Sequence, residues 1–112
     1  MDLTSSEIDG ITNVALAGRL DTEGVGAVEL AFTATIVPAR LPAVIDLGAV
    51  SFIGSLGVRL IIGTARALAT KGNKLALYGA GEAVAEIIET TGLDELVPVV
   101  ATQAEALAAV GG

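Results

Sequence analysis

Three side chains in this sequence lie where they could carry chemistry: Ser55, Asp21 and Asp46. Ser55 follows Gly54 at the start of a predicted helix, where a hydroxyl can act as an N-cap for a first-turn amide. The same hydroxyl can receive a phosphoryl group, because the free amides and the dipole of a helix N-terminus tolerate negative charge. The two roles of Ser55 are compatible, and both are open.

The two aspartates lie close to predicted strand ends. Asp46 is near the carboxyl end of a short apolar run, where open α/β sheets usually place their sites. Asp21 lies in the loop after the second predicted strand. Helix capping and turn formation also explain both carboxylates. With no histidine, lysine or metal cluster as companion, they make a poor catalytic pair.

The composition argues against an enzyme. The sequence has no histidine and no cysteine, so it cannot supply a Ser-His-Asp or Cys-His mechanism or a thiolate metal site. Ile53 occupies the place where a nucleophile elbow needs glycine, and Val84 breaks the dinucleotide fingerprint after Gly79–Gly81. The Gly-Lys-Ser/Thr triplet of a phosphate-binding loop does not occur. We therefore expect no catalytic residue, no metal and no cofactor.

The charge balance bears on the class of partner. The formal net charge is −7, from 13 acidic and 6 basic residues. Such a surface repels nucleic-acid phosphates and anionic lipid headgroups. The aromatic side chains (Phe32, Phe52 and Tyr78) provide no platform for stacking bases. Nucleic-acid binding is therefore not expected.

The most apolar stretch, 43–63, contains Asp46, Arg59 and several glycines, so it does not resemble a membrane-spanning helix. The N-terminal segment is acidic and polar, unlike a signal peptide. With no cysteine present, these features predict a cytoplasmic protein without direct membrane insertion.

The pattern of apolar residues predicts one α/β domain over residues 1–112. Asp9-Gly10 marks a hairpin, and the later strands alternate with helices. This order predicts a small mixed sheet, an N-terminal hairpin followed by parallel strands, packed with about four helices. Strands are expected at 3–8, 11–17, 43–47, 74–78 and 96–100, and helices at 23–37, 55–71, 82–91 and 102–110.

Some local details follow from the same pattern. Residues 48–54 are expected to form a turn-rich connection. Asp21 or Thr22 is expected to cap the first helix, whose apolar side includes Leu30. Leu56 is expected on the buried side of the second helix.

Five segments of the chain, at 18–22, 44–58, 71–77, 91–96 and 102–109, together resemble in their order the STAS domain family, which includes the anti-sigma-factor antagonists. There a strand ending in Asp-Leu-Ser leads to Val-x-Phe-Ile-Asp-Ser-Ser/Thr-Gly-Leu at a helix start, and residues 44–58 resemble that signature. The other segments are similar to the family's Gly-x-Leu/Val-Asp, Gly-x-x-Leu-x-Leu and Thr-Gly-Leu-Asp motifs and to its capped last helix; they lie at 18–22, 71–77, 91–96 and 102–109. The resemblance covers nearly the whole chain in order.

The resemblance implies a STAS-like fold and a binding role. In that family the unphosphorylated antagonist binds an anti-sigma factor, usually a serine kinase of the histidine-kinase ATPase fold, and a sigma factor is released. The kinase then phosphorylates the serine at the helix start, and the complex dissolves. Carried onto this sequence, Ser55 matches the phospho-acceptor, Gly57 the glycine after the Ser/Thr pair, and Asp21 the loop aspartate near the acceptor.

The sequence departs from the family pattern at three positions. Gly54 replaces the aspartate before the acceptor, Leu56 replaces the second Ser/Thr, and Gly48 replaces the serine after Asp-Leu. The loss of the aspartate alters what a kinase would recognise, and Leu56 makes the turn more apolar. The partner-binding residues implied by the resemblance are Asp21, Phe52, Ile53, Gly54, Leu56 and Gly57.

A second function is open: an adaptor that is not phosphorylated, as a STAS subunit of a lipid-transport ABC system or of a stress-signalling assembly. The apolar turn around Ser55 fits this use as well as it fits an antagonist. A co-purifying ATPase-fold serine kinase would favour the antagonist, and a transporter ATPase the adaptor. The sequence leaves the oligomeric state open.

Overall fold

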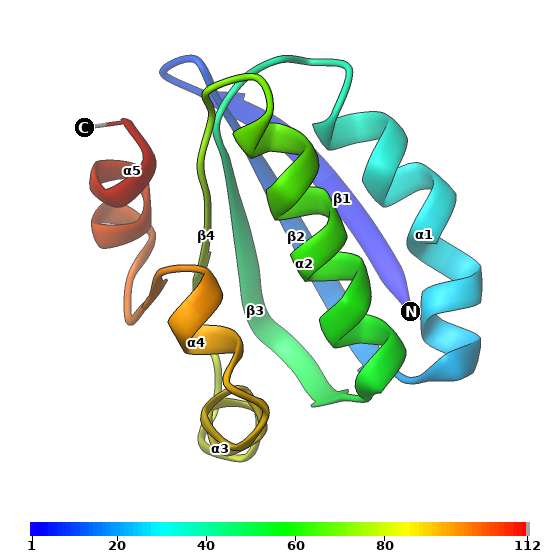
Figure 1. The fold of residues 1–112 in the computed structure, drawn as a ribbon. Coiled ribbons are helices and arrows are strands. Elements are labelled where there is room, and N and C mark those ends of the chain that lie inside the picture. Colours follow the sequence, from blue (N-terminus) through cyan, green and yellow to red (C-terminus); the bar gives the residue numbers. More distant parts are fainter. Residues whose placement is uncertain (112) are drawn as a thin grey trace.

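The computed structural model describes residues 1–111, which contain a five-stranded sheet in the order β1-β2-β3-β4-β5 (Figure 1). β1 and β2 are antiparallel, and each later strand runs parallel to the one before it. The predicted mixed sheet, a hairpin followed by parallel strands, is therefore confirmed. The strands are β1 (Asp2–Ile8), β2 (Ile11–Leu20), β3 (Ala43–Ile53), β4 (Leu75–Tyr78) and β5 (Val99–Val100).

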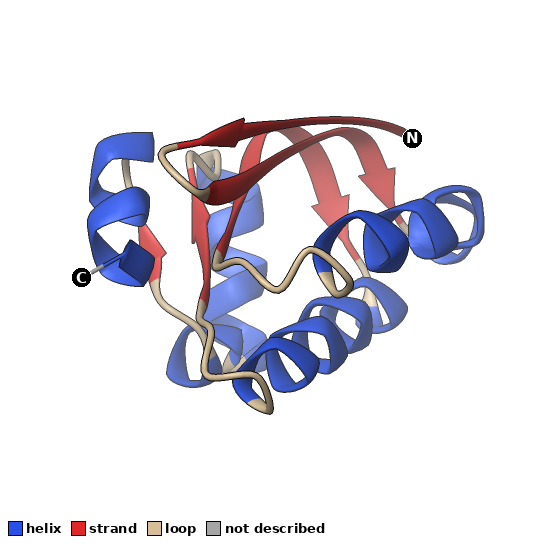
Figure 2. Ribbon diagram, turned by 90° about the horizontal axis from the view of Figure 1, so that it is seen from above, coloured by secondary structure: helices blue, strands red, loops and turns tan. Residues whose placement is uncertain are grey.

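The helices lie on both faces of the sheet (Figures 1 and 2). Those from α1 to α4 share one hydrophobic core with the sheet, and α5 packs on the opposite face, next to β4. None of the helices in residues 1–111 is long and apolar enough to span a lipid bilayer. The helices are α1 (Thr22–Ile36), α2 (Ser55–Ala69), α3 (Glu82–Thr91), α4 (Leu93–Leu96) and α5 (Gln103–Gly111).

The hairpin and the main core follow the sequence signals. Asp9 (φ 50°) and Gly10 (φ 77°) both have positive φ, as a two-residue turn matched to the strand twist requires. On the face of the sheet that α1 to α4 cover, Phe32 and Ile36 of α1 are fully buried against alternate residues of the strands. The burial of each of these side chains stabilises the folded state by about 1.5–3 kcal/mol. This packing fixes α1 and α2 on the sheet and so fixes where each helix begins.

β3 is longer than the prediction, which places a turn-rich connection at 48–54. The strand continues to Ile53 because β2 also continues, to Leu20, and pairs with it along its length. Two register irregularities let extra residues of β3 bulge out without ending the ladder. The predicted connection is therefore wrong, and the turn before α2 is reduced to Gly54.

The strand predicted at 96–100 is also too long. Gly92 ends α3 in the left-handed conformation (φ 76°), and Leu93, which is buried, starts the single turn α4. β5 comprises only Val99–Val100, directly after Pro98. Proline has no N–H to donate to a strand ladder, which favours a short strand here. Within residues 1–111, the one helix beyond the predicted four is α4, a single turn between Gly92 and the predicted strand.

Two leucines predicted on the buried sides of their helices are exposed. Leu30 is 84% exposed, because it follows the buried Val28 by two residues, about 200° around the helix. Leu56 is 39% exposed at the open end of α2. Leu30 therefore adds nothing to the core, and Leu56 is available at the surface.

Candidate functional site

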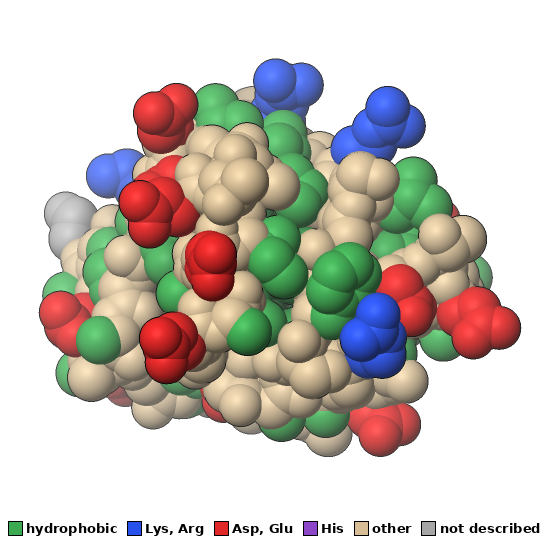
Figure 3. Space-filling model, turned by 90° about the horizontal axis from the view of Figure 1, so that it is seen from below, with side chains coloured by type: hydrophobic (Ala, Val, Ile, Leu, Met, Phe, Trp, Pro, Cys, Tyr) green, Lys and Arg blue, Asp and Glu red, His purple; other side chains and the backbone are tan. Residues whose placement is uncertain are grey.

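The predicted site residues meet at the edge of the sheet where β2 and β3 end. The register pairs Arg19 with Phe52 and Leu20 with Ile53, and the N–H of Gly54 donates to the carbonyl of Leu20 (2.9 Å). The starts of α1 and α2 are therefore neighbours at this edge, which is the lower one in Figure 1. Figure 3 looks onto it and shows hydrophobic side chains reaching the surface between acidic and basic ones.

Ser55 is the first residue of α2, and it is exposed. The N-cap is Gly54, which has extended backbone and no side chain to accept a hydrogen bond from a first-turn amide, so the hypothesis that Ser55 caps the helix is wrong. The first intrahelical bond runs from the N–H of Val58 to the carbonyl of Gly54 (3.0 Å). The amides of the three residues before Val58 have no acceptor within the helix. The exposed hydroxyl thus lies at an uncapped, electropositive helix end.

Asp21 caps α1, as expected. Its Oδ1 accepts a hydrogen bond from the N–H of Gly24 (2.9 Å), and its Oδ2 accepts one from Nε of Arg19 (3.3 Å). The bond from Gly24 is the main cause that lowers the pKa of Asp21, with a smaller contribution from Arg19. Both carboxylate oxygens are therefore occupied by contacts within the chain. Asp21 supports the geometry of this edge, and it is not a free general base for Ser55.

Arg19 is a site residue that the sequence reasoning missed. Its guanidinium carbon lies 4.5 Å from the centroid of the Phe52 ring, while the same group pairs with Asp21. The contact depends on the register of β2 against β3, and no motif in the sequence specifies that register. The arginine joins the two turns at this edge.

The other predicted contact residues differ in exposure. Ile53 and Gly57 are buried, so they shape the turn and do not offer surface to a partner. A Cβ at position 57 would lie 2.8 Å from Cγ and Cδ2 of Leu20, which shows how closely α2 approaches β2. Phe52 and Gly54 are half-buried, and Leu56 is exposed. The accessible part of the site is therefore a small apolar turn around Ser55.

Asp46 does not belong to this site. It lies in the middle of β3, roughly 20 Å along the strand from Ile53. Its Oδ1 accepts a hydrogen bond from the N–H of Gly48 (2.8 Å), and its register partner on β4 is Tyr78. The expectation that Asp46 lies at a strand end fails because β3 continues past it. Among residues 1–111, no cluster of three or more acidic, His or Cys side chains could hold a metal ion.

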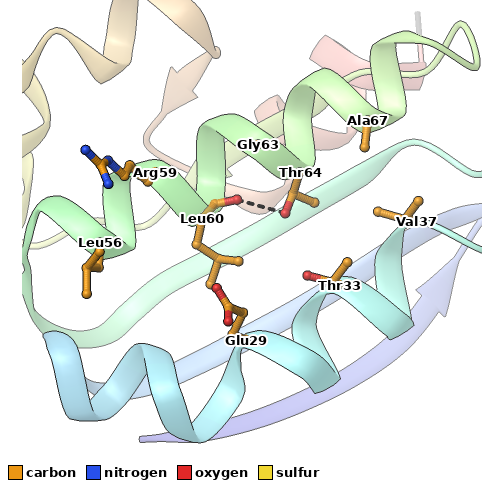
Figure 4. A pocket seen from close by; sticks show the side chains of 9 residues that line it. All are labelled: Glu29, Thr33, Val37, Leu56, Arg59, Leu60, Gly63, Thr64 and Ala67. Carbon is orange, nitrogen blue, oxygen red and sulfur yellow. Dashed lines mark hydrogen bonds between the residues drawn. The ribbon is translucent and has the colours of Figure 1, made fainter.

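A groove of about 410 Å³ between α1 and α2 begins beside Ser55 (Figure 4). Leu56 lies at its open end, and Leu60 and Ala67 continue it along α2. Thr64 turns its hydroxyl back to donate to the carbonyl of Leu60 (2.8 Å), which leaves the groove largely apolar. Its full lining is Glu29, Thr33, Val37, Leu56, Arg59, Leu60, Gly63, Thr64 and Ala67.

Known proteins match this chain over almost its whole length. BtrV of Bordetella bronchiseptica, which is named as an anti-sigma factor antagonist, is 28% identical over 109 residues, 97% of this chain and 94% of BtrV. The anti-sigma-F factor antagonist RsfB of Mycobacterium tuberculosis is 26% identical over 110 residues, 98% of this chain and 89% of RsfB.

The crystal structure of an anti-sigma factor antagonist from Mycobacterium paratuberculosis has the same fold, with a TM-score of 0.88 and 31% identity. The match covers 99% of this chain and 94% of that one. The family model of the STAS domain matches residues 2–106. This chain therefore belongs to the STAS domain family.

Proposed function

We propose that this chain is an anti-sigma factor antagonist that is switched off by phosphorylation of Ser55. The observation that carries the proposal is the exposed Ser55 hydroxyl, which lies on an apolar turn at an uncapped helix end. In the active state the turn binds an anti-sigma factor, and a sigma factor is released. The relatives that bear the antagonist name support this assignment.

The binding surface follows from the exposed side chains. Leu56 offers 39% of its surface to solvent beside Ser55, and the half-buried ring of Phe52 completes the turn. An apolar patch flanked by charged groups is typical of a protein–protein contact. The Ser55 hydroxyl is neutral, so covering it costs a partner much less free energy than covering a charged phosphate would.

The anti-sigma factor that binds the turn is also the kinase that switches the antagonist off; it is a serine kinase of the histidine-kinase ATPase fold. The Oγ of Ser55 forms a bond to the γ-phosphorus of ATP, the bond from that phosphorus to the bridging oxygen breaks, and ADP leaves. The hydroxyl proton passes to a base on the kinase or to water, because this chain has no histidine and Asp21 is already occupied. The chain is the substrate of this reaction and supplies no catalytic group.

A phosphate at Ser55 would favour dissociation without harming the fold. It adds a charge of about −2 to the turn, which an apolar partner surface cannot solvate. Within the chain, the free N–H groups at the start of α2 can donate hydrogen bonds to the phosphate oxygens and so stabilise the negative charge. The modification therefore penalises the complex and leaves the free protein intact.

Two measurements test the proposal. Intact-mass analysis of the protein from its own cells is expected to show a phosphate increment that Ser55→Ala removes and Ser51→Ala keeps. Ser51 is the matched control, because it is an exposed serine on the same segment whose hydroxyl bonds to the carbonyl of Gly18 (3.4 Å). Co-purification is expected to recover an ATPase-fold serine kinase.

Other outcomes would change the assignment. No phosphate under growth or stress, together with normal behaviour of Ser55→Ala cells, would refute the switch. A transporter ATPase in place of the kinase would make the chain the adaptor of a lipid-transport system. A kinase without any phosphate would leave an antagonist that acts by binding alone.

A further inference from the structure

Arg59 lies one turn after Ser55 on the same exposed face of α2. Residues four apart on a helix have Cβ atoms about 5–6 Å from each other, so their side chains can pair. Figure 4 shows the Arg59 side chain turned back toward the start of α2, over the turn that carries Leu56. This is the usual direction for a long side chain on a helix, toward its N-terminus.

Arg59 has no carboxylate partner within residues 1–111. The one ion pair in this part of the chain joins Arg19 and Asp21. Glu29 lines the same groove from α1, but it makes no ion pair with Arg59. The guanidinium is therefore available to a new anion.

The other charged groups near this edge compete little for a phosphate on Ser55. Arg19 and Asp21 offset each other. Glu23 and Glu82 occupy the first turns of the neighbouring helices α1 and α3 and can only repel it. The next basic residue on α2, Arg66, is about 16 Å along the helix from Ser55. Arg59 is thus the cation best placed to receive the phosphate.

We propose that Arg59 binds the phosphate of phosphorylated Ser55; the inference rests on the proposed function for the existence of that phosphate. A guanidinium suits a phosphate because its N–H groups match two oxygens at once. The pairing draws Arg59 to the start of α2 and away from the rim of the groove. Phosphorylation then changes two charges of the partner surface together: it adds an anion at Ser55 and neutralises the cation at Arg59.

The test uses full-length chain with phosphoserine installed at position 55 during translation, so no kinase is needed. Three proteins are compared by ³¹P NMR titration: the parent, Arg59→Gln and Arg66→Gln. Each variant removes one exposed arginine from α2, and the free amides at the helix start are the same in all three. A cation one turn away stabilises the dianion and is expected to lower the second pKa of the phosphate by about 0.15–0.4.

The second pKa of the phosphate is expected to be the same in the parent and in Arg66→Gln, and higher in Arg59→Gln. Arg59→Lys is expected to fall between them, because lysine keeps the charge and loses the planar fork. If Arg59→Gln titrates with the parent, or if Arg66→Gln shifts as much, the inference is overturned. Circular dichroism checks that each protein is folded. The titration decides the role of Arg59, whereas the mass measurement on cells decides whether Ser55 is phosphorylated at all.

Discussion

The guanidinium carbon of Arg19 lies 4.5 Å from the centroid of the Phe52 ring, and this contact joins the ends of β2 and β3. The two residues are register partners in neighbouring parallel strands. Because Arg19 also pairs with the cap of α1, Asp21, one side chain connects the starts of both helices at the edge that carries Ser55. The shape of the proposed partner surface therefore depends on it.

A double-mutant cycle should measure this contact. Arg19→Gln and Phe52→Leu are each expected to destabilise the protein slightly, and the pair is expected to show a coupling of about 0.5 kcal/mol. The value is small because Arg19 is 60% exposed and solvent screens its charge. Urea denaturation of the four proteins gives the coupling. Strict additivity of the two single changes would show that the stacked geometry contributes nothing.

The close approach of α2 to β2 predicts opposite effects for two glycines of the same helix. A Cβ at Gly57 would lie 2.8 Å from side-chain atoms of the buried Leu20 and 3.0 Å from its carbonyl oxygen, so Gly57→Ala is expected to cost about 1–3 kcal/mol. A Cβ at Gly63 would meet no atom within 4 Å, so Gly63→Ala is expected to stabilise by about 0.5–1 kcal/mol. Thermal or urea unfolding measures both. Equal effects of the two changes would contradict the packing described here.

The sequence predicts elements whose signals are local. α3 begins and ends at the predicted residues, 82 and 91, because Gly92 provides the left-handed residue that ends a helix. The hairpin follows from Asp9-Gly10, and the cap of α1 from Asp21. In each case a residue within a few positions supplies the required backbone conformation or hydrogen bond.

Features that depend on a distant strand could not be predicted in the same way. β3 runs past Gly48 because β2 supplies pairing partners, and sequence alone does not reveal the bulges that allow this. The same register brings Arg19 over Phe52. The sequence does not distinguish Gly54 from Ser55 as the N-cap of α2, because both residue types occur at N-caps and only the backbone conformation decides between them.

Asp21 should make stability depend on pH in the acid range. Its folded pKa lies below the ordinary value of 3.8, so the carboxylate contributes stability above that pH and loses it as the pH falls through the folded pKa. Asp21→Asn keeps a good N-cap but removes the charge. The parent is expected to be more stable than Asp21→Asn at neutral pH, with the gap closing in acid. A stability difference that stays constant with pH would contradict this account. Asp21→Ala should be less stable than Asp21→Asn at every pH, because alanine also removes the cap.

Tyr78 should make stability depend on pH in the alkaline range. Its hydroxyl donates to Oδ1 of Asn13 (2.8 Å) and accepts from Nε2 of Gln103 (3.2 Å) beneath α5. Burial raises the pKa of Tyr78 above 10.0, and the charge of Asp46 adds to the increase. The unfolded chain then loses this proton first, so stability is expected to fall as the pH rises above 10.0.

Tyr78→Phe separates the hydrogen bond from the titration. The variant is expected to be about 1 kcal/mol less stable near neutral pH, because it removes the hydrogen bond that the phenol donates to Asn13 and the one that it accepts from Gln103. The alkaline decline that is due to the phenol is expected to disappear. Tyr78 is the one tyrosine of the chain, so the absorbance of the phenolate reports its titration directly. A phenolate that forms at the ordinary pH in the folded protein would refute the burial argument.

Two exposed leucines should differ sharply in their effect on binding. Leu56 is 39% exposed beside Ser55 at the mouth of the groove, whereas Leu30 is 84% exposed on α1 and does not line that groove. If the apolar turn is the contact surface, Leu56→Ser is expected to weaken binding of the co-purified anti-sigma kinase by about tenfold or more, since an apolar anchor at an interface contributes more than 1 kcal/mol. Leu30→Ser is expected to leave the affinity unchanged. Isothermal titration calorimetry measures both, and unfolding curves confirm that each variant stays folded. A loss of affinity in Leu30→Ser with none in Leu56→Ser would move the partner surface from the start of α2 to the outer side of α1.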